Sequence, residues 1–237
     1  MARVALLFDF DGTLSPINVP REKAGLSEDM VKALEALSEK YVLGIVSSKD
    51  CHFLKKKLPR VVQNLACANG LEITAAGYLV VDELAVEKKQ LTEAVLEEAR
   101  GLGVEVEVKK SLLGFPLGLS IDWGYGREKP VEVSSFLSRV EKLGFYVLEY
   151  PGYWFADVYP SRRSKGDAIR VLKALLGLDK VVYFGDSVSD IPAFAEANVA
   201  VLVEHEYNRN FTFPRVNYRV GFKDLPRWLL RELDNLA

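Results

Sequence analysis

The sequence feature that most constrains the fold is a set of short runs built almost entirely from apolar residues. Four of these runs occupy Val4–Phe8, Val42–Val46, Val181–Phe184 and Val199–Val203. Strands that are apolar throughout have both faces buried, as in parallel sheets that are covered by helices on both sides. Segments with helical spacing of apolar residues separate the runs, for example between residues 27 and 41. The pattern therefore predicts an α/β fold whose core is a doubly wound, Rossmann-like parallel sheet.

A different pattern interrupts this alternation between about residues 84 and 158. The stretch V-E-V-E-V at 104–108 alternates strictly, which predicts a strand with one solvent-facing side. With its neighbours it gives the order αββαββ, which is typical of an antiparallel sheet with helices on one side. We therefore expect a core domain formed by residues 1–83 and 159–237 and an inserted α+β domain at 84–158.

Overall charge and cysteine content exclude several function classes. The formal net charge is −2, so the chain has no general attraction to nucleic acid or to anionic membranes. Two cysteines and two histidines are too few for a disulfide framework or a thiolate zinc site. No apolar run approaches the roughly 18 residues of a membrane-spanning helix. We therefore expect a cytoplasmic protein without a nucleic-acid or membrane partner, and the sequence leaves its oligomeric state open.

Polar clusters follow three of the predicted buried strands. The first cluster contains Asp9 and Asp11, the second is Ser47-Ser48-Lys49, and the third runs from Gly185 to Asp190. Because the carboxyl ends of parallel strands meet at one edge of a sheet, these clusters should lie close together. Asp9 and Asp11 are two residues apart, so in an extended chain their side chains project to the same side. Two like charges so placed indicate a bound cation or a shared proton.

The residue types in these clusters suit phosphoryl transfer. Asp9 and Asp186 offer the hard oxygen ligands that Mg²⁺ prefers, and Asp190 could hold either a metal-bound water or a lysine. Ser47 offers a hydroxyl to a phosphate, and Lys165 offers an ammonium at a predicted helix start. A carboxylate, a metal site and a phosphate cradle together suggest transfer of a phosphoryl group to an aspartate.

Four motifs carry a resemblance to a known superfamily. D-F-D-G-T-L, I-V-S-S-K, S-K-G-D-A and F-G-D-S-V-S-D occur in this order and resemble the signature motifs of the haloacid dehalogenase-like (HAD) phosphatases. The αββαββ insert resembles the α/β cap of the branch that holds sugar phosphatases and trehalose-phosphatase-like enzymes. The resemblance implies a Mg²⁺-dependent phosphomonoesterase that acts on a small, sugar-like phosphorylated metabolite, with the cap closing over the leaving group.

The resemblance also implies a role for individual residues. Asp9 would be the nucleophile that forms an aspartyl-phosphate, and Asp11 the general acid and base. The metal site would comprise Asp9, Asp186, the backbone carbonyl of Asp11, and Asp190 in support. Phosphate binding is expected from Gly12, Ser47, Ser48 and Lys165, and contacts to the rest of the substrate from Lys49, Asn69, Tyr125, Arg127, Arg162 and Arg163.

Other interpretations of the same residues stay open at this point. A phosphomutase or phosphotransferase would use the same motifs, and a phosphoryl-accepting signalling module also groups acidic residues with a lysine on a doubly wound sheet. Such a module has no use for the insert or for an acid two residues beyond the nucleophile. Asn69 could be only a turn former, and Arg162 and Arg163 could be an ordinary solvated pair.

Overall fold

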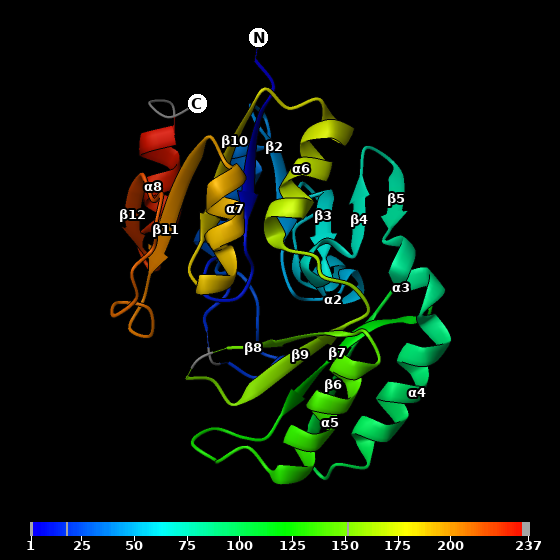
Figure 1. The fold of residues 1–237 in the computed structure, drawn as a ribbon. Coiled ribbons are helices and arrows are strands. Elements are labelled where there is room, and N and C mark those ends of the chain that lie inside the picture. The colour runs from blue at the N-terminus through cyan, green and yellow to red at the C-terminus, as the bar shows by residue number, and fades with distance from the viewer. Residues whose placement is uncertain (1, 18, 151, 234–237) are drawn as a thin grey trace. The chain divides into compact units, whose positions relative to one another are not determined.

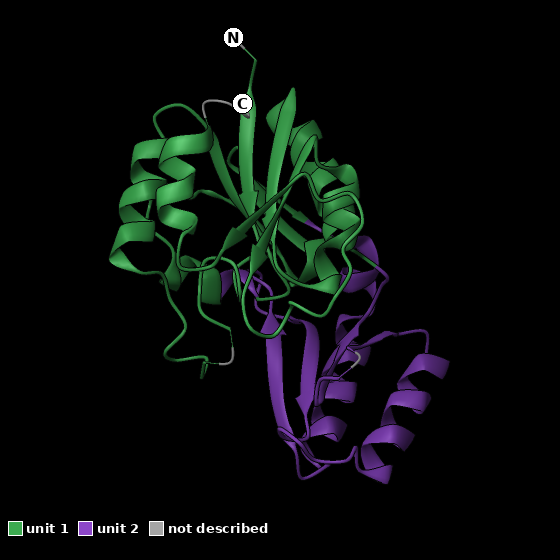
Figure 2. Ribbon diagram, turned by 90° about the vertical axis from the view of Figure 1, so that its left-hand side faces the viewer, with its two compact units in different colours: residues 1–49, 53–80, 163–237 green, residues 50–52, 81–162 purple. Residues whose placement is uncertain are grey.

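The computed structural model describes residues 2–17, 19–150 and 152–233 of the chain. It divides into two compact units, shown in green and purple in Figure 2. Unit 1 comprises residues 1–49, 53–80 and 163–237, and unit 2 comprises residues 50–52 and 81–162. Unit 1 is therefore assembled from both ends of the chain, and the insert expected at 84–158 lies within the long segment of unit 2.

Unit 1 contains an eight-stranded sheet with the order β12-β11-β10-β1-β2-β3-β4-β5 (Figure 1). Six strands run parallel, and β4 pairs antiparallel with β3. The bounds are β1 (Val4–Phe8), β2 (Val42–Val46), β3 (Asn64–Cys67), β4 (Glu72–Ala75), β5 (Tyr78–Val81), β10 (Lys180–Gly185), β11 (Val199–Glu204) and β12 (Tyr218–Gly221). The doubly wound α/β core predicted from the apolar runs is confirmed.

Strand β1 lies between β10 and β2, where the strand order changes direction. Phe8 at the end of β1 is in register with Phe184 of β10 and with Ile45 of β2. The three strands consequently end at the same edge of the sheet. In open α/β sheets this switch point is the place where ligands bind.

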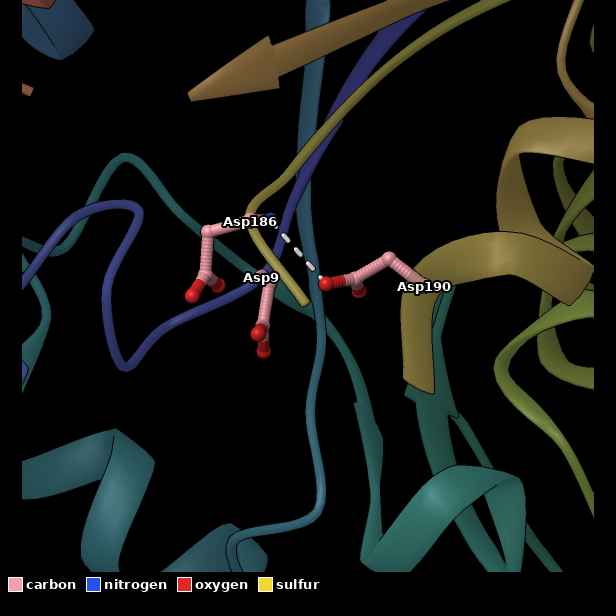
Figure 3. A group of neighbouring side chains, drawn as sticks. All are labelled: Asp9, Asp186 and Asp190. Carbon is pink, nitrogen blue, oxygen red and sulfur yellow. Dashed lines mark hydrogen bonds between the residues drawn. The ribbon is translucent and has the colours of Figure 1, made fainter. Parts of the chain in front are cut away.

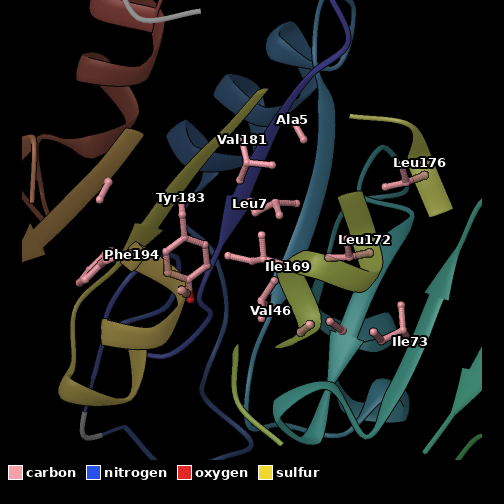
Figure 4. Packing of buried hydrophobic residues seen from close by; sticks show 14 of the residues in the cluster. Ala5, Leu7, Val46, Ile73, Ile169, Leu172, Leu176, Val181, Tyr183 and Phe194 are labelled. Atoms are coloured by element: carbon pink, nitrogen blue, oxygen red, sulfur yellow. The ribbon is translucent and has the colours of Figure 1, made fainter. Parts of the chain in front are cut away.

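Helices lie on both sides of the unit 1 sheet (Figure 2). The helical segments of this part of the chain are α1 (Glu28–Leu37), α2 (Cys51–Lys57), η1 (Ala68–Gly70), α6 (Lys165–Leu176), η2 (Val188–Asp190), α7 (Ile191–Glu196) and α8 (Leu225–Glu232). The first two residues of α2 are counted with unit 2. Helix α6 packs Ile169 and Leu172 against Leu7, Val46 and Tyr183 of the sheet, and all five side chains are buried (Figure 4). This apolar contact fixes the helix whose first residue is Lys165.

The start of α6 agrees with the capping-box pattern in the sequence. The Ser164 hydroxyl accepts a hydrogen bond from the backbone N–H of Asp167, and the Asp167 carboxylate accepts one from the backbone N–H of Ser164. The helix therefore begins at a defined residue. Lys165, the first residue after the cap, points its side chain into the interior of unit 1.

Unit 2 contains an antiparallel sheet with the order β6-β7-β9-β8. Its strands are β6 (Glu105–Lys110), β7 (Pro116–Asp122), β8 (Tyr146–Glu149) and β9 (Phe155–Tyr159), and its helices are α3 (Glu83–Glu87), α4 (Lys89–Arg100) and α5 (Val131–Lys142). Leu119, Ile121 and Val158 pack with apolar side chains of α4 and α5, which cover one face (Figure 1). The αββαββ order predicted for the insert is confirmed.

Within the described part of the chain, every helix is too short or too polar to span a lipid bilayer.

Candidate active site

Three carboxylates come together at the edge of the unit 1 sheet where β1 and β10 end (Figure 3). Asp9 follows β1, Asp186 follows β10, and Asp190 is the last residue of η2. One oxygen atom from each lies within 4.8 Å of the others, and all three residues are buried. The sheet thus unites residues that are far apart in the sequence, as the positions of the motifs predict.

Lys165 supplies a positive charge to this group. Its Nζ lies 2.9 Å from Oδ2 of Asp9 and 2.7 Å from Oδ1 of Asp190. Burial by itself would lower the pKa of Lys165, but the carboxylates of Asp190 and Asp9 outweigh it and raise this pKa above the ordinary value. The side chain is therefore an ammonium at neutral pH.

Both oxygen atoms of Asp190 are fully engaged by the protein. Oδ1 accepts hydrogen bonds from Lys165 and from the hydroxyl of Tyr183, at 2.7 and 2.6 Å. Oδ2 accepts from the backbone N–H groups of Asp186 and Ser187, at 3.0 and 2.9 Å, and from the Ser187 hydroxyl. The sequence left open whether Asp190 holds a lysine or a metal-bound water, and in the structure it holds the lysine.

The carboxylate of Asp186 has different neighbours: two side chains within hydrogen-bond distance, and Gly12 in close contact. Thr13 Oγ1 donates to Oδ1 at 3.3 Å, and Nε2 of His205 lies 2.8 Å from Oδ2. Gly12 has φ 77°, and a Cβ at this position would lie 2.3 Å from Asp186 Oδ2. Glycine is therefore required both by the backbone conformation and by the close approach of the carboxylate.

Negative charge exceeds positive charge in this buried group. Burial and the nearby carboxylates of Asp190 and Asp186 raise the pKa of Asp9, although Lys165 opposes them. Burial and the charge of Asp190 likewise raise the pKa of Asp186. A divalent cation would offset these repulsions, and Asp9 and Asp186 offer it the hard oxygen donors that Mg²⁺ prefers. The residues present therefore fit a Mg²⁺ ion.

Asp11 lies outside the group of three carboxylates. Its Oδ2 is 3.6 Å from Nζ of Lys49, and its side chain is 36% exposed, so it is far more accessible than Asp9. The turn that follows is closed by a hydrogen bond from the Gly12 N–H to the Ser15 carbonyl. Of the two carboxylates after β1, Asp11 is therefore the one that solvent can reach.

Ser47 and Asn69 are joined through the backbone. Ser47 follows β2 and is buried, its N–H donates to the carbonyl of Ala66, and its carbonyl accepts from the N–H of Asn69. Asn69 is 4% exposed and has φ 58°, and its Oδ1 has no hydrogen-bond partner among the described residues. Ser48 is half-buried beside them. The loop after β2, with Ser47 and Ser48, and the loop after β3, with Asn69, are therefore hydrogen-bonded to each other.

The remaining substrate candidates have less defined surroundings. Tyr125 is 81% exposed and its ring lies 4.2 Å from that of Trp154, while Arg127 is exposed. The Arg162 guanidinium lies over the ring of Tyr146. These residues belong to unit 2, whereas the group around Asp9 belongs to unit 1, and the exposed Arg163 begins the returning segment of unit 1.

The sequence analysis missed His205 and Asn208, which follow β11. Burial lowers the pKa of His205 below its ordinary value although the nearby Glu206 carboxylate acts in the opposite direction, so the ring is neutral at pH 7. Asn208 is buried and donates to the backbone carbonyl of Asp186. The signal that could have revealed them was available: Val199–Val203 is a predicted strand of the same sheet, and its carboxyl end leads to the same edge.

The sheet order and the inserted antiparallel unit define the fold, and the group of carboxylates with one lysine lies at its switch point. The chain has the fold of the HAD phosphatases that carry an α/β cap. A family model described as Trehalose-phosphatase matches residues 7–115. The predicted resemblance to the trehalose-phosphatase-like branch is confirmed, and this family match indicates an enzyme of the phosphatase class.

Individual relatives extend this likeness over the whole chain. A solved structure of a trehalose-6-phosphate phosphatase related protein is 20% identical with a TM-score of 0.74, covering 98% of this chain and 99% of that one. A HAD subclass IIB sugar phosphatase is 15% identical with a TM-score of 0.67, and the match covers both chains fully, at 100%. An uncharacterized glycosyl hydrolase of Mycobacterium tuberculosis is 26% identical over 225 residues, which is 86% of this chain. The chain spans only 16% of the length of that relative.

Proposed function

We propose that the protein is a Mg²⁺-dependent phosphomonoesterase that hydrolyses a small sugar phosphate through an aspartyl-phosphate. The observation that carries this proposal is the position of Asp9, a buried carboxylate at a strand end that contacts Lys165 and lies close to Asp186. A carboxylate so placed is aligned to attack a phosphoryl group whose negative charge the same lysine can bind.

In the proposed first step, an oxygen of Asp9 attacks phosphorus and the bond from phosphorus to the substrate oxygen breaks. Lys165 and the Ser47 hydroxyl bind the phosphoryl oxygens, and Gly12 and Ser48 line the same edge. Mg²⁺, held by Asp9, Asp186 and the Asp11 carbonyl, would offset the charge of the phosphoryl group. Asp190 contributes by holding Lys165, through the 2.7 Å contact of Oδ1 with Nζ.

Asp11 is the proposed general acid and base. In the first step it gives a proton to the departing alkoxide, and in the second it takes a proton from the water that attacks the phosphorus of phosphorylated Asp9. Inorganic phosphate leaves and Asp9 is restored. The partial exposure of Asp11 and its separation from the buried carboxylates support this role, because the group must meet both the leaving oxygen and water.

The insert at 84–158 is the proposed cap, flanked by a core of residues 1–83 and 159–237, and we propose that it selects the substrate. The names of the relatives support a sugar phosphate as the substrate class. Aromatic rings and guanidinium groups are suited to sugar rings and to their hydroxyls. The candidates for these contacts are Lys49, Asn69, Tyr125, Arg127, Arg162 and Arg163.

The test is a panel of phosphate esters incubated with the purified protein and Mg²⁺, with release of inorganic phosphate as the measurement. The proposal expects release from sugar phosphates and from an aryl phosphate, and none with the Asp9→Asn variant. Transfer of the phosphoryl group to a second sugar position without release would instead identify a mutase. A stable phosphorylated protein without turnover would identify a signalling module, and either result would overturn the proposal.

A further inference from the structure

We infer that the loop after β11 positions the carboxylate of Asp186 for the divalent cation, with His205 as the orienting donor and Asn208 as its anchor. This inference rests on the proposed function, since it concerns the same metal site. Neither residue belongs to the four motifs that point to the site, and both lie in the segment 205–208 that follows β11.

The hydrogen bonds of His205 determine which ring nitrogen carries the proton. Nδ1 accepts from the backbone N–H of Tyr207 at 3.2 Å, so in a neutral ring the proton is on Nε2. Nε2 lies 2.8 Å from Oδ2 of Asp186 and donates to it. The contact is therefore a directed hydrogen bond from a neutral donor, and the side chain of His205 is 10% exposed.

Asn208 links the backbone of His205 to the backbone of Asp186, the proposed metal ligand. Its Nδ2 donates to the backbone carbonyls of Asp186 and Val203, each at 2.8 Å. Its Oδ1 accepts from the backbone N–H of His205 at 3.0 Å. The amide of Asn208 thereby ties the end of β11 to the residue after β10 and fixes the loop from which His205 projects.

The opposite side of the Asp186 carboxylate is fixed as well. Thr13 donates to Oδ1, and the Cα of Gly12 lies against Oδ2, where no side chain would fit. Each oxygen thus receives one neutral donor and keeps a lone pair for a cation. Asp190 contrasts with this, because its oxygens are occupied by an ammonium and four further donors. The different surroundings explain why Asp186, and not Asp190, keeps the capacity to bind metal.

Loss of the Nε2 donor should leave the carboxylate free to rotate. Groups that orient a ligand in this way typically contribute about 10- to 100-fold to metal affinity. A purely structural role of His205 would alter stability without a selective effect on the affinity for Mg²⁺. The affinity for the metal itself, measured without substrate, therefore separates the two roles.

The experiment is titration of the metal-free full chain with Mg²⁺ by calorimetry. His205→Phe is expected to raise the Kd for Mg²⁺ at least tenfold, and His205→Gln, which keeps a donor, to raise it less. His52→Phe is the matched control, because His52 also bonds through Nε2, to the carbonyl of Ser111, and should bind Mg²⁺ as the wild type does. Saturating Mg²⁺ should restore most of the kcat of His205→Phe.

A second measurement needs no substitution in the loop. The chain has two histidines, so the ring nitrogen resonances can be assigned by comparison with His52→Phe. Addition of Mg²⁺ should shift the signals of the His205 ring, protonated on Nε2, with the Kd found by calorimetry, and should leave those of His52 in place. Two results would overturn the inference even if the wild type binds Mg²⁺ and hydrolyses phosphate esters. One is a His205 signal that does not shift when Mg²⁺ is added, and the other is a Kd for Mg²⁺ that is unchanged in His205→Phe. Failure of the wild type in both respects would instead overturn the proposed function.

Discussion

Nζ of Lys165 lies 2.9 Å from Oδ2 of Asp9 in the interior of unit 1. The proposed nucleophile is therefore already in contact with the cation that would bind the phosphoryl group. In such an arrangement the two side chains need little reorganisation when the substrate enters, which is the main source of electrostatic catalysis.

Replacement of Asp9 by asparagine should remove nearly all activity. The amide has the same shape as the carboxylate but is a poor nucleophile toward phosphorus and a weaker ligand for Mg²⁺. We expect kcat on an aryl phosphate to fall by at least two orders of magnitude. The exposed Asp29 in the first turn of α1 provides the control Asp29→Asn, which should keep wild-type turnover. A variant of Asp9 with a tenth of normal turnover would place the nucleophile elsewhere.

Replacement of Lys165 by alanine should lower kcat/KM by about 10²- to 10³-fold, the usual loss when one charge-stabilising donor is removed. The same change leaves three buried carboxylates without their ammonium, so the free energy of unfolding should fall by about 3–5 kcal/mol. Lys173 lies in the same helix and bonds only the carbonyl of Glu196 among the contacts described, so Lys173→Ala is the control. Unchanged kcat/KM in Lys165→Ala would show that the lysine is only structural.

The effect of Asp11→Asn on the rate of phosphoenzyme formation should depend on the leaving group of the substrate. An alkoxide from a sugar needs a proton in order to depart, whereas a nitrophenolate leaves readily without one. Rapid-quench measurements should therefore find phosphoenzyme formation slowed far more with a sugar phosphate than with nitrophenyl phosphate. With the aryl substrate, phosphorylated Asp9 should accumulate, because the attack of water also depends on Asp11. Equal slowing with both substrates would mean that Asp11 only supports the metal site.

Removal of divalent cations should abolish hydrolysis, because burial and the nearby carboxylate of Asp190 raise the pKa of both Asp9 and Asp186 although Lys165 opposes the increase, and a divalent cation would offset this excess of negative charge. Excess chelator should stop phosphate release, and Mg²⁺ should restore it. Mg²⁺ that binds the native state should also raise the unfolding free energy, by about 2.7 kcal/mol at a concentration 100 times its Kd. Thermal unfolding with and without chelator measures this, and full activity in excess chelator would contradict the proposed mechanism.

The capping box of α6 should make stability depend on pH in the acid range. Burial acts against it, but hydrogen bonds from Ser164 and the charge of Arg170 hold the pKa of Asp167 below its ordinary value of 3.8. The ionised carboxylate therefore stabilises the native state above pH 3.8, and this contribution is lost as the pH falls through the lower native pKa. Urea unfolding should show Asp167→Asn to be less stable than the wild type by about 1 kcal/mol at neutral pH. The difference should shrink below pH 3.8, and a constant difference would exclude the ionised cap as its source.

Much of the fold and the centre of the candidate site followed from the sequence for a physical reason. Apolar runs that are buried on both faces specify parallel strands, and parallel strands bring their carboxyl ends to one edge. This argument alone places Asp9, Asp186 and Asp190 at the same edge of the sheet, and the structure shows them together there. The strict alternation at 104–108 likewise specified a sheet with one apolar face, observed as the packing of Val106 and Val108 with the α4 and α5 core.

The details that escaped prediction depend on side-chain direction and on loop conformation. Whether Asp190 holds a lysine or a water depends on a rotamer, and spacing in the sequence does not fix it. The contact between His205 and Asp186 joins two strand-end loops, and the path of the loop after β11 is set by the backbone bonds of Asn208. The spacing of apolar residues in the sequence does not predict the path of such a loop. The contact of His205 with Asp186 is therefore seen only in the tertiary structure.

The parallel pairing of β1 with β10 sets the order in which the protein can acquire its chemistry during synthesis. Val4 pairs with Lys180, and the whole of the long unit 2 segment, residues 81–162, lies between them in the sequence. The four strands of the inserted sheet lie between Glu105 and Tyr159, so this sheet can form while β1 still lacks its partner on the ribosome. Long-range pairing of this kind closes slowly. An emerging chain therefore carries Asp9 long before Asp186, and the group of three buried carboxylates cannot form until Asp190 has been synthesised.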